Sequence, residues 1–230
     1  MKDDRYHRGH RPEMAPLLPA EYQHVLEIGC GEGAFAGSLK PGCEIWGVEM
    51  HEASTKIASQ RLHRVLIGTY DAVQPELPEN YFDLVICNDV IEHLPDHDAF
   101  FESVSGKLRE GGYLVASIPN MRYYYCLREL LLRKEWVYRD QGIMDRTHLR
   151  FFTERSIRRT LAEHGFSIEA FKGINRLRGS KRVLRALFFV VLTLGYYADI
   201  LYQQFGFRAV NGRKGEKRNQ DPLPPDAREK

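Results

Sequence analysis

Short apolar runs alternate with amphipathic segments along most of this chain. The apolar runs predict strands at 24–29, 44–50, 64–68, 82–87, 113–119, 166–172 and 205–210. Helical spacing is found at 52–62, 97–109 and 154–164. Asp96 and Thr153 stand where the last two helices need N-caps. Because nearly continuous apolar strands alternating with helices are typical of a parallel sheet covered on both faces, the pattern predicts an α/β fold.

Two long segments interrupt the alternation. Residues 120–152 are rich in tyrosine and arginine, and residues 173–203 hold a basic run followed by an apolar stretch. Long insertions at the ligand-facing edge of a scaffold usually carry specificity, so 120–152 is the expected substrate region and 173–203 an expected helical insertion. The polar ends, 1–14 and 212–230, are expected to be flexible, which leaves one domain at 15–211.

Composition and charge argue against some classes of function. A net charge of +2 over 230 residues creates no global field for nucleic acid, so a nucleic-acid partner is not expected. The four cysteines are scattered without CxxC spacing, which argues against a disulfide or zinc framework and favours a reducing, cytoplasmic location. The first residues lack the apolar core of a signal peptide.

One uncharged stretch, Ala186–Ala198, follows three basic residues, Lys181, Arg182 and Arg185. It is too short to span a bilayer, which needs about 20 apolar residues. A basic flank beside an apolar helix suits a membrane surface, so one expectation is peripheral contact through 181–198 at the inner face of the membrane. The other expectation is a buried helix or one that forms a homodimer.

A glycine-rich turn follows the first strand and opens a segment expected to be helical. Gly29, Gly31 and Gly33 let the backbone pass close under a ligand. Gly29, Gly31 and Ala34 also fit a dinucleotide fingerprint, which alone is a weak signal. Glu27 lies two residues before the first glycine, and a carboxylate there suits a cationic ligand rather than a pyrophosphate.

Polar residues also follow the next two strands. In a parallel sheet the ligand lies at the carboxyl ends of the strands. Glu49 ends the second strand and suits the diol of a ribose. Asp71 and Ala72 follow the third strand and suit an adenine amino group. These positions favour a nucleoside with a cationic end.

Five motifs together resemble the class I S-adenosylmethionine-dependent methyltransferases: "VLEIGCGEG", "GVEM", "YDA", "FDLVICNDVIEHL" and "LREGGYLVASIPN". Their order and spacing match over about 22–120, and the rest is compatible through about 211. The resemblance implies a Rossmann-like, doubly wound, seven-stranded sheet that is mostly parallel with an antiparallel last strand. It implies S-adenosyl-L-methionine as cofactor.

The resemblance also assigns roles at the cofactor. It places Glu27 near the amino group of the methionine moiety, the three glycines under the cofactor and Glu49 on the ribose hydroxyls. It packs Met50 on adenine, places Asp71 with Ala72 at the adenine N6, and puts Asn88 at the methionine end.

The stretch "DVIEH" carries Asp89, Glu92 and His93, and His148 follows the fifth strand. In a helix, Asp89 and Glu92 would share one face. Two carboxylates and two neutral imidazoles form a reasonable shell for Mg²⁺ or Mn²⁺. The stretch resembles the Glu-x-x-Glu-His motif of ubiquinone-pathway O-methyltransferases and small-RNA 2′-O-methyltransferases, with Asp89 replacing the first Glu.

The alternative needs no metal. A methyl acceptor with a hydroxyl must lose its proton, and His148 can act as the base or hydrogen-bond the substrate. His93 would then contact the cofactor or cap the helix. His148 and His93 are therefore the candidate catalytic residues under either hypothesis.

The segment from 119 to 153 resembles, more loosely, a bacterial subgroup associated with polysaccharide and glycan assembly. The matching residues are Pro119, Asn120, Trp136, Tyr138, Gly142, Asp145, His148, Arg150, Phe151, Phe152 and Thr153. This implies a hydroxyl on a sugar or lipid-linked glycan as acceptor. Three alternatives stay open: a quinone or other lipophilic small molecule, the 2′-hydroxyl of RNA, or a non-enzymatic binding module with this fold.

Side chains of the same segment suit a glycan. Aromatic rings stack on sugar faces, and the candidates are Tyr123, Tyr124, Trp136 and Tyr138. Arginines bind phosphate, and the candidates are Arg122, Arg139 and Arg146. The tyrosines can equally be packing residues that cover the sheet.

Overall fold

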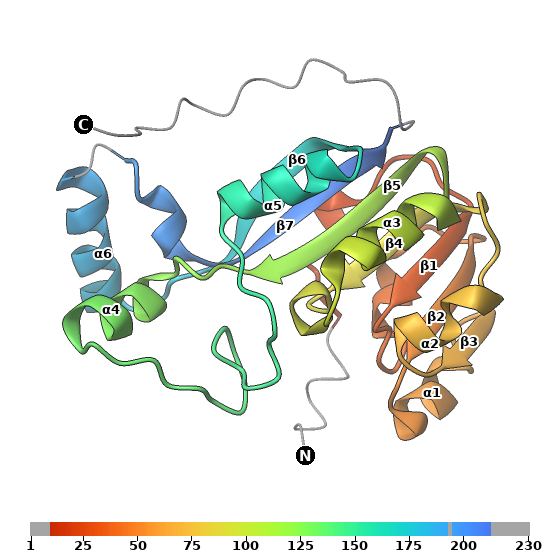
Figure 1. Ribbon diagram of the computed structural model, residues 1–230, viewed down its shortest axis with the longest axis horizontal. Helices are drawn as coiled ribbons and strands as arrows, with labels where there is room; N and C mark the ends of the chain where they lie inside the picture. Colours follow the sequence, from red (N-terminus) through yellow and green to blue (C-terminus); the bar gives the residue numbers. More distant parts are fainter. Residues whose placement is uncertain (1–9, 193–194, 213–230) are drawn as a thin grey trace.

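Seven strands form one sheet in the order β3-β2-β1-β4-β5-β7-β6 (Figure 1). The computed structural model describes residues 10–192 and 195–212. The strands are β1 (His24–Ile28), β2 (Glu44–Glu49), β3 (Arg64–Ile67), β4 (Phe82–Asn88), β5 (Leu108–Pro119), β6 (Phe166–Arg176) and β7 (Tyr202–Asn211). Neighbours pair in parallel from β3 to β5, and β7 runs antiparallel to both β5 and β6. The predicted fold is therefore confirmed.

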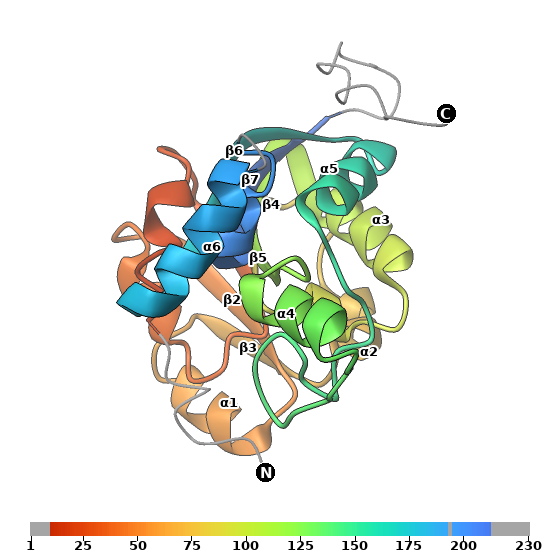
Figure 2. The same cartoon turned by 90° about the vertical axis from the view of Figure 1, so that its left-hand side faces the viewer.

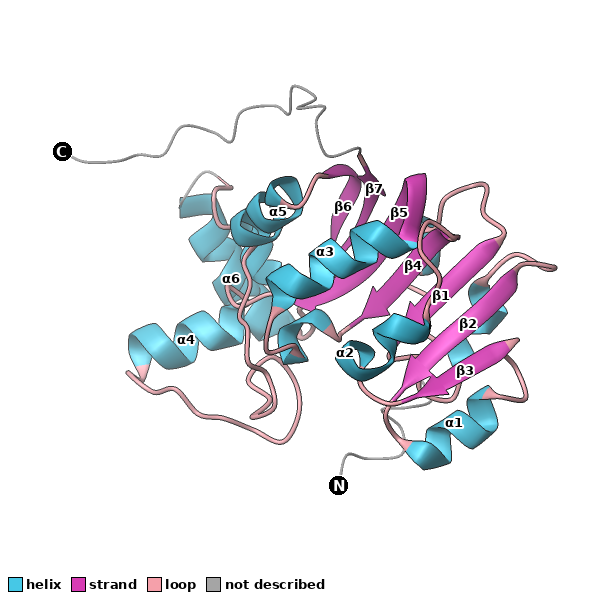
Figure 3. Ribbon diagram, turned by 45° about the vertical axis from the view of Figure 1, so that its right-hand side comes forward, coloured by secondary structure: helices cyan, strands magenta, loops and turns pink. Residues whose placement is uncertain are grey.

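Helices cover both faces of the sheet (Figure 3). The α-helices are α1 (Glu52–Ala58), α2 (Tyr70–Val73), α3 (His97–Lys107), α4 (Tyr124–Leu132), α5 (Glu154–Glu163) and α6 (Ser180–Leu192). The 3₁₀ turns are η2 (Ala15–Leu17), η3 (Ala34–Ser38), η4 (Gln74–Glu76), η5 (Ile91–His93) and η6 (Ala198–Leu201). One core cluster joins α2, α3 and α5 to the sheet, and a second joins η2, η3 and α1 to its other face.

Local sequence signals fix two of the helices. The side chain of Asp96 accepts a hydrogen bond from Ala99 N–H and begins α3. Thr153 and Ser156 form a reciprocal capping box at the start of α5, and the left-handed Gly165 follows its end. The segment after the glycine turn differs from the expectation, because it forms only the short 3₁₀ turn η3.

The structure also differs from the expectation of a flexible segment at 1–14. Residues 1–9 lie outside the described residues, but Met14 is fully buried and Leu17 nearly so, in the core cluster beside η3 and α1. A Cβ on Gly206 of β7 would approach Leu17 to 2.8 Å, which shows how closely this segment lies on the sheet. Of the tail predicted at 212–230, only Gly212 is described.

The two insertions gather at one end of the molecule, at the left of Figure 1 and facing the viewer in Figure 2. The first insertion is closed at its base by hydrogen bonding of Met121 N–H to the Phe152 carbonyl at 2.9 Å. In the second, α6 packs with η6 against aromatic and aliphatic side chains at the start of α4. This end lies beyond the carboxyl ends of β4 and β5, where an acceptor would approach.

Candidate functional site

The glycine turn after β1 has a backbone that only glycine adopts easily. Gly29, Gly31 and Gly33 all have left-handed φ angles, of +72°, +53° and +72°. A Cβ on Gly29 would lie 2.6 Å from Cγ2 of Val90, so a larger residue would also clash with the segment after β4. The turn is held against β2 because Gly29 N–H donates to the Val48 carbonyl at 2.8 Å.

Glu49 ties this turn to the end of β2. Its carboxylate is buried and accepts hydrogen bonds from Gly31 N–H at 2.9 Å and from His51 N–H at 2.8 Å. Each carboxylate oxygen has a second lone pair, so both oxygens can still accept from a ribose hydroxyl. Glu49 therefore lies where the sequence predicts a ribose contact, and it also shapes the turn beneath the ligand.

Glu27 and Asn88 are polar groups whose burial calls for a ligand. The Glu27 side chain is buried beside Glu49, and burial with this neighbouring charge raises its pKa to about 8. Its Oε2 atom has no hydrogen-bond partner among the described residues, and neither does the side-chain amide of Asn88. Buried polar groups are nearly always paired, so an ammonium and a carbonyl or carboxylate supplied by a ligand fit this corner.

The predicted adenine contacts lie at the same edge. Met50 follows Glu49 and is 72% exposed, and Asp71 and Ala72 are exposed on α2. Hydrogen bonding of Gly68 N–H to the Glu49 carbonyl at 3.0 Å joins the ends of β2 and β3. The structure thus brings the nucleoside-binding candidates together along the ends of three neighbouring strands.

Asp89 does not join the metal cluster predicted for it, and that part of the prediction is wrong. Asp89 has a left-handed φ of +56° and lies outside η5, so it shares no helical face with Glu92. Its carboxylate instead accepts from Ser117 Oγ at 2.8 Å and from Gln204 Nε2 at 2.7 and 2.8 Å, and it pairs with Arg11.

Arg11 is the site residue that sequence reasoning missed. Its guanidinium pairs with Asp89 and donates to Ser117 Oγ at 2.9 Å. The opposed charges of Asp89 and Glu13 raise its pKa despite burial, so the group stays charged. The only signal in the sequence was an arginine in a polar segment 78 positions before Asp89.

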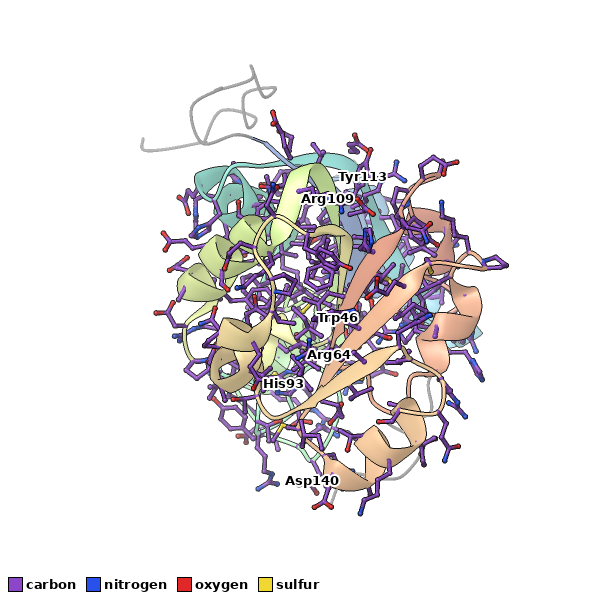
Figure 4. The ribbon with its side chains drawn as sticks, turned by 90° about the vertical axis from the view of Figure 1, so that its right-hand side faces the viewer. Trp46, Arg64, His93, Arg109, Tyr113 and Asp140 are labelled. Carbon is purple, nitrogen blue, oxygen red and sulfur yellow. The ribbon has the colours of Figure 1, made fainter. Side chains whose placement is uncertain are left out.

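Glu92, His93 and His148 do come together. One ligand atom from each lies within 4.8 Å of the others. The rings of His93 and His148 contact edge to face at 4.6 Å between centroids, and His148 Nε2 lies 4.0 Å from Glu92 Oε1. Figure 4 shows His93 at the carboxyl edge of the sheet, at the opposite end of the strands from Arg109 and Tyr113.

Backbone hydrogen bonds fix the loop that carries His148. The N–H groups of Leu149 and Arg150 donate to the Glu92 carbonyl at 2.8 and 3.0 Å. His148 Nδ1 donates to the Ile143 carbonyl at 2.9 Å, which leaves Nε2 as the basic nitrogen of the neutral ring. The imidazole is buried and oriented with its basic nitrogen toward Glu92, an arrangement suited to accepting a proton.

A pocket of about 360 Å³ lies between α4 and the loop before His148. Its walls include Tyr125, Trp136 and Ile143, together with two arginines and two glutamates, of which Arg128 and Glu129 form an ion pair. Ile143 lines the pocket, and its backbone carbonyl accepts the hydrogen bond from His148 Nδ1. The pocket is therefore a candidate acceptor site, reached from His148 through Ile143.

Several side chains that the sequence suggested as glycan contacts make other interactions within the protein. Arg122 is tied to Asp199 by two hydrogen bonds of 2.5 and 3.1 Å, and Arg146 pairs with Asp140 at 2.8 Å. Tyr123 and Tyr124 pack against the cluster of α6 and η6, and Tyr123 also lines the pocket. Of the predicted aromatic contacts, Trp136 and Tyr138 remain substantially exposed.

This chain is similar to known proteins, and the share of the chain that is matched differs from one comparison to the next. Residues 5–170 match the family described as "Methyltransferase domain". The ubiquinone biosynthesis O-methyltransferase of Paracidovorax citrulli is 30% identical over 114 residues, which are 45% of this chain and 47% of that protein. The chain thus spans about half the length of the curated relatives it matches.

Solved structures match over most of the chain. A SAM-dependent methyltransferase from Archaeoglobus fulgidus is 22% identical with a TM-score of 0.61, covering 90% of this chain and 94% of that one. The 1,6-didemethyltoxoflavin-N1-methyltransferase of Burkholderia thailandensis, solved with S-adenosylhomocysteine, is 16% identical with a TM-score of 0.60, covering 92% and 82%. At these identities the likeness is one of fold.

Proposed function

Because this chain belongs to the methyltransferase domain family, we propose that it transfers a methyl group from S-adenosylmethionine to the hydroxyl of a small acceptor. The observation that carries the proposal is the buried, unsatisfied pair of Glu27 and Asn88 beside the glycine turn. A pyrophosphate carries no cation that could pair with the carboxyl of Glu27. An amino-acid end on a nucleoside satisfies both groups.

The residues at the strand ends would hold the cofactor as follows. Glu49 takes the ribose hydroxyls above the glycine turn, and Met50 and Asp71 with Ala72 border the adenine. Glu27 takes the ammonium group. Arg11, which contacts Asp89 and Ser117 at the ends of β4 and β5, would take the carboxylate. The sulfonium of the bound cofactor supplies an activated methyl group, so the protein need only align the acceptor and remove its proton.

Proton removal falls to His148. Its Nε2 is the basic nitrogen, and the nearby carboxylate of Glu92 stabilises the imidazolium that forms. The ring of His93 contacts the ring of His148. A hydrogen bond between His93 Nδ1 and Thr147 fixes the orientation of the His93 ring. The same three side chains fit a divalent cation, since one carboxylate and two imidazoles are acceptable donors. Such a cation would lower the pKa of an acceptor hydroxyl.

The acceptor best supported is a phenolic or quinol-type hydroxyl on a lipophilic small molecule. The curated relatives, which match 45% and 47% of this chain, are named for ubiquinone biosynthesis. Aromatic and aliphatic side chains such as Tyr125, Trp136 and Met144 form much of the pocket wall. A sugar hydroxyl is the second candidate, favoured by the charged side chains of Arg128, Glu129 and Arg139 in the same wall.

A methyl-transfer assay separates the two acceptors. Purified protein and radiolabelled S-adenosylmethionine are offered a prenylated catechol, a nucleotide sugar and a lipid-linked sugar in parallel. We expect label in the catechol, because a flat lipophilic ring fits the pocket and its hydroxyl is the most acidic. If only a sugar is labelled, the sugar hydroxyl becomes the preferred acceptor. If the protein binds the cofactor but labels none of the three compounds, this acceptor assignment is contradicted.

The same assay tests the cation. Loss of transfer in a chelator, restored by Mg²⁺ or Mn²⁺, would place a metal at Glu92, His93 and His148. Unchanged transfer would leave proton removal to His148 alone.

A further inference from the structure

The helix α6 presents an apolar face to solvent as well as to the protein. Ala186 is fully buried, and Val183, Leu187 and Val190 pack with it onto the cluster around η6. On the other side, Leu184 and Phe188 are each 70% exposed and Val191 is 72% exposed. Their spacing of four and three residues puts them on one stripe of the helix. The solvent-facing stripe of an ordinary surface helix is polar. This apolar stripe therefore indicates a surface that another molecule or a membrane covers.

Neighbouring segments enlarge the apolar surface. At the end of α4, Leu131 and Leu132 are well exposed, and Tyr196 beyond α6 is exposed too. Figures 1 and 2 show α4 and α6 at the same end of the molecule, projecting away from the sheet. We call Leu184, Phe188, Val191, Leu131, Leu132 and Tyr196 the apolar end. Exposed hydrophobic surfaces larger than single side chains mark contact sites.

The charge along the segment that contains α6 is one-sided. Between 172 and 198 the sequence holds six basic residues and no acidic one. Arg176 and Arg178, just before α6, are exposed. The next acidic residue, Asp199, is held by Arg122. The side chains of Lys181, Arg182 and Arg185, which carry the predicted membrane contact, lie outside the described residues.

We propose that the apolar end docks on the surface of an anionic lipid bilayer. Apolar side chains that enter the boundary between headgroups and acyl chains, beside basic residues that attract anionic headgroups, are the combination that holds a protein at such a surface. No described helix has the length and apolarity to cross a bilayer, so the contact is superficial. The helix α4 also lines the acceptor pocket through Cys126 and Arg128, so docking brings that pocket to the lipid.

Vesicle flotation of the full chain tests the proposal. We expect it to float with vesicles of phosphatidylcholine and phosphatidylglycerol, and far less with phosphatidylcholine alone or in high salt. The triple variant Leu184→Gln/Phe188→Gln/Val191→Gln should partition about 10- to 100-fold less, because three apolar side chains no longer enter the bilayer. The matched control is Ile67→Gln, an exposed apolar residue on the edge strand β3, which should float like the unaltered protein.

A second variant tests the electrostatic part. Arg176→Gln/Arg178→Gln changes only exposed side chains, and it should weaken flotation on anionic vesicles while leaving thermal unfolding unchanged. Failure of the unaltered protein to float, or equal flotation of the triple variant and the control, would overturn the proposal. So would a stable dimer in solution that the triple variant converts to monomer, since the apolar end would then join two copies of this chain.

Discussion

Replacement of His148 by glutamine is expected to lower turnover by about 10²- to 10⁴-fold, the usual contribution of a general base. Glutamine cannot accept the proton. The affinity for S-adenosylmethionine should not change, because the described contacts of His148 are with Ile143, Glu92 and His93 and not with Glu27, Glu49 or the glycine turn. Single-turnover rates and calorimetric titration measure the two quantities separately.

The matched control for this variant is His164→Gln. His164 hydrogen-bonds Asp98 at 2.9 Å and stacks on Phe101, so these contacts are with α3 and not with Glu92, His93 or His148. Its replacement should leave turnover near normal. Near-normal turnover in His148→Gln, or a larger loss in His93→Gln, would remove the base assignment from His148.

Replacement of Glu27 by glutamine is expected to weaken cofactor binding by about 10- to 100-fold, since a hydrogen bond to a charged group contributes about 1.5–3 kcal/mol. The amide has nearly the same shape but no charge for the ammonium group. The pKa of about 8 adds a pH signature. Below pH 8 the unliganded carboxyl is mostly protonated, whereas the bound ammonium needs it ionised. Affinity should therefore rise with pH toward 8, with release of a proton on binding.

Calorimetry in buffers of different ionisation enthalpy measures that proton directly. In Glu27→Gln the release and the pH slope should both disappear. Glu76→Gln, an exposed carboxylate in η4, is the control and should keep both. Unchanged affinity and proton release in Glu27→Gln would contradict the place given to the ammonium group.

The sequence predicted the sheet and the helices α1, α3 and α5 because their signals are local. The apolar runs of the strands, the cap at Asp96 and the capping box at Thr153 each depend on residues close in the chain. The glycine turn was predictable for the same reason, because its left-handed backbone needs glycine. The pairing of His93 with His148 spans 55 positions, and only the resemblance to known motifs indicated it.

The sequence could not predict where a side chain points when its own backbone leaves the helical conformation. Asp89 was placed on a helical face with Glu92, but its left-handed backbone turns the carboxylate toward Ser117 and Gln204. The partner that completes this network, Arg11, comes from a segment whose composition resembles a flexible end. Its contact with Asp89 depends on the burial of Met14 under the sheet, a tertiary effect with no local signal.

We expect a sulfonium nucleoside to lie across the ends of β1 and β2. A crystal structure of the protein with S-adenosylhomocysteine would show whether it does. We expect the ribose hydroxyls on the carboxylate of Glu49, the ammonium group on Glu27 and the adenine between Met50 and Asp71. An empty turn in crystals that contain the nucleoside, or a nicotinamide dinucleotide bound there in its place, would contradict the account.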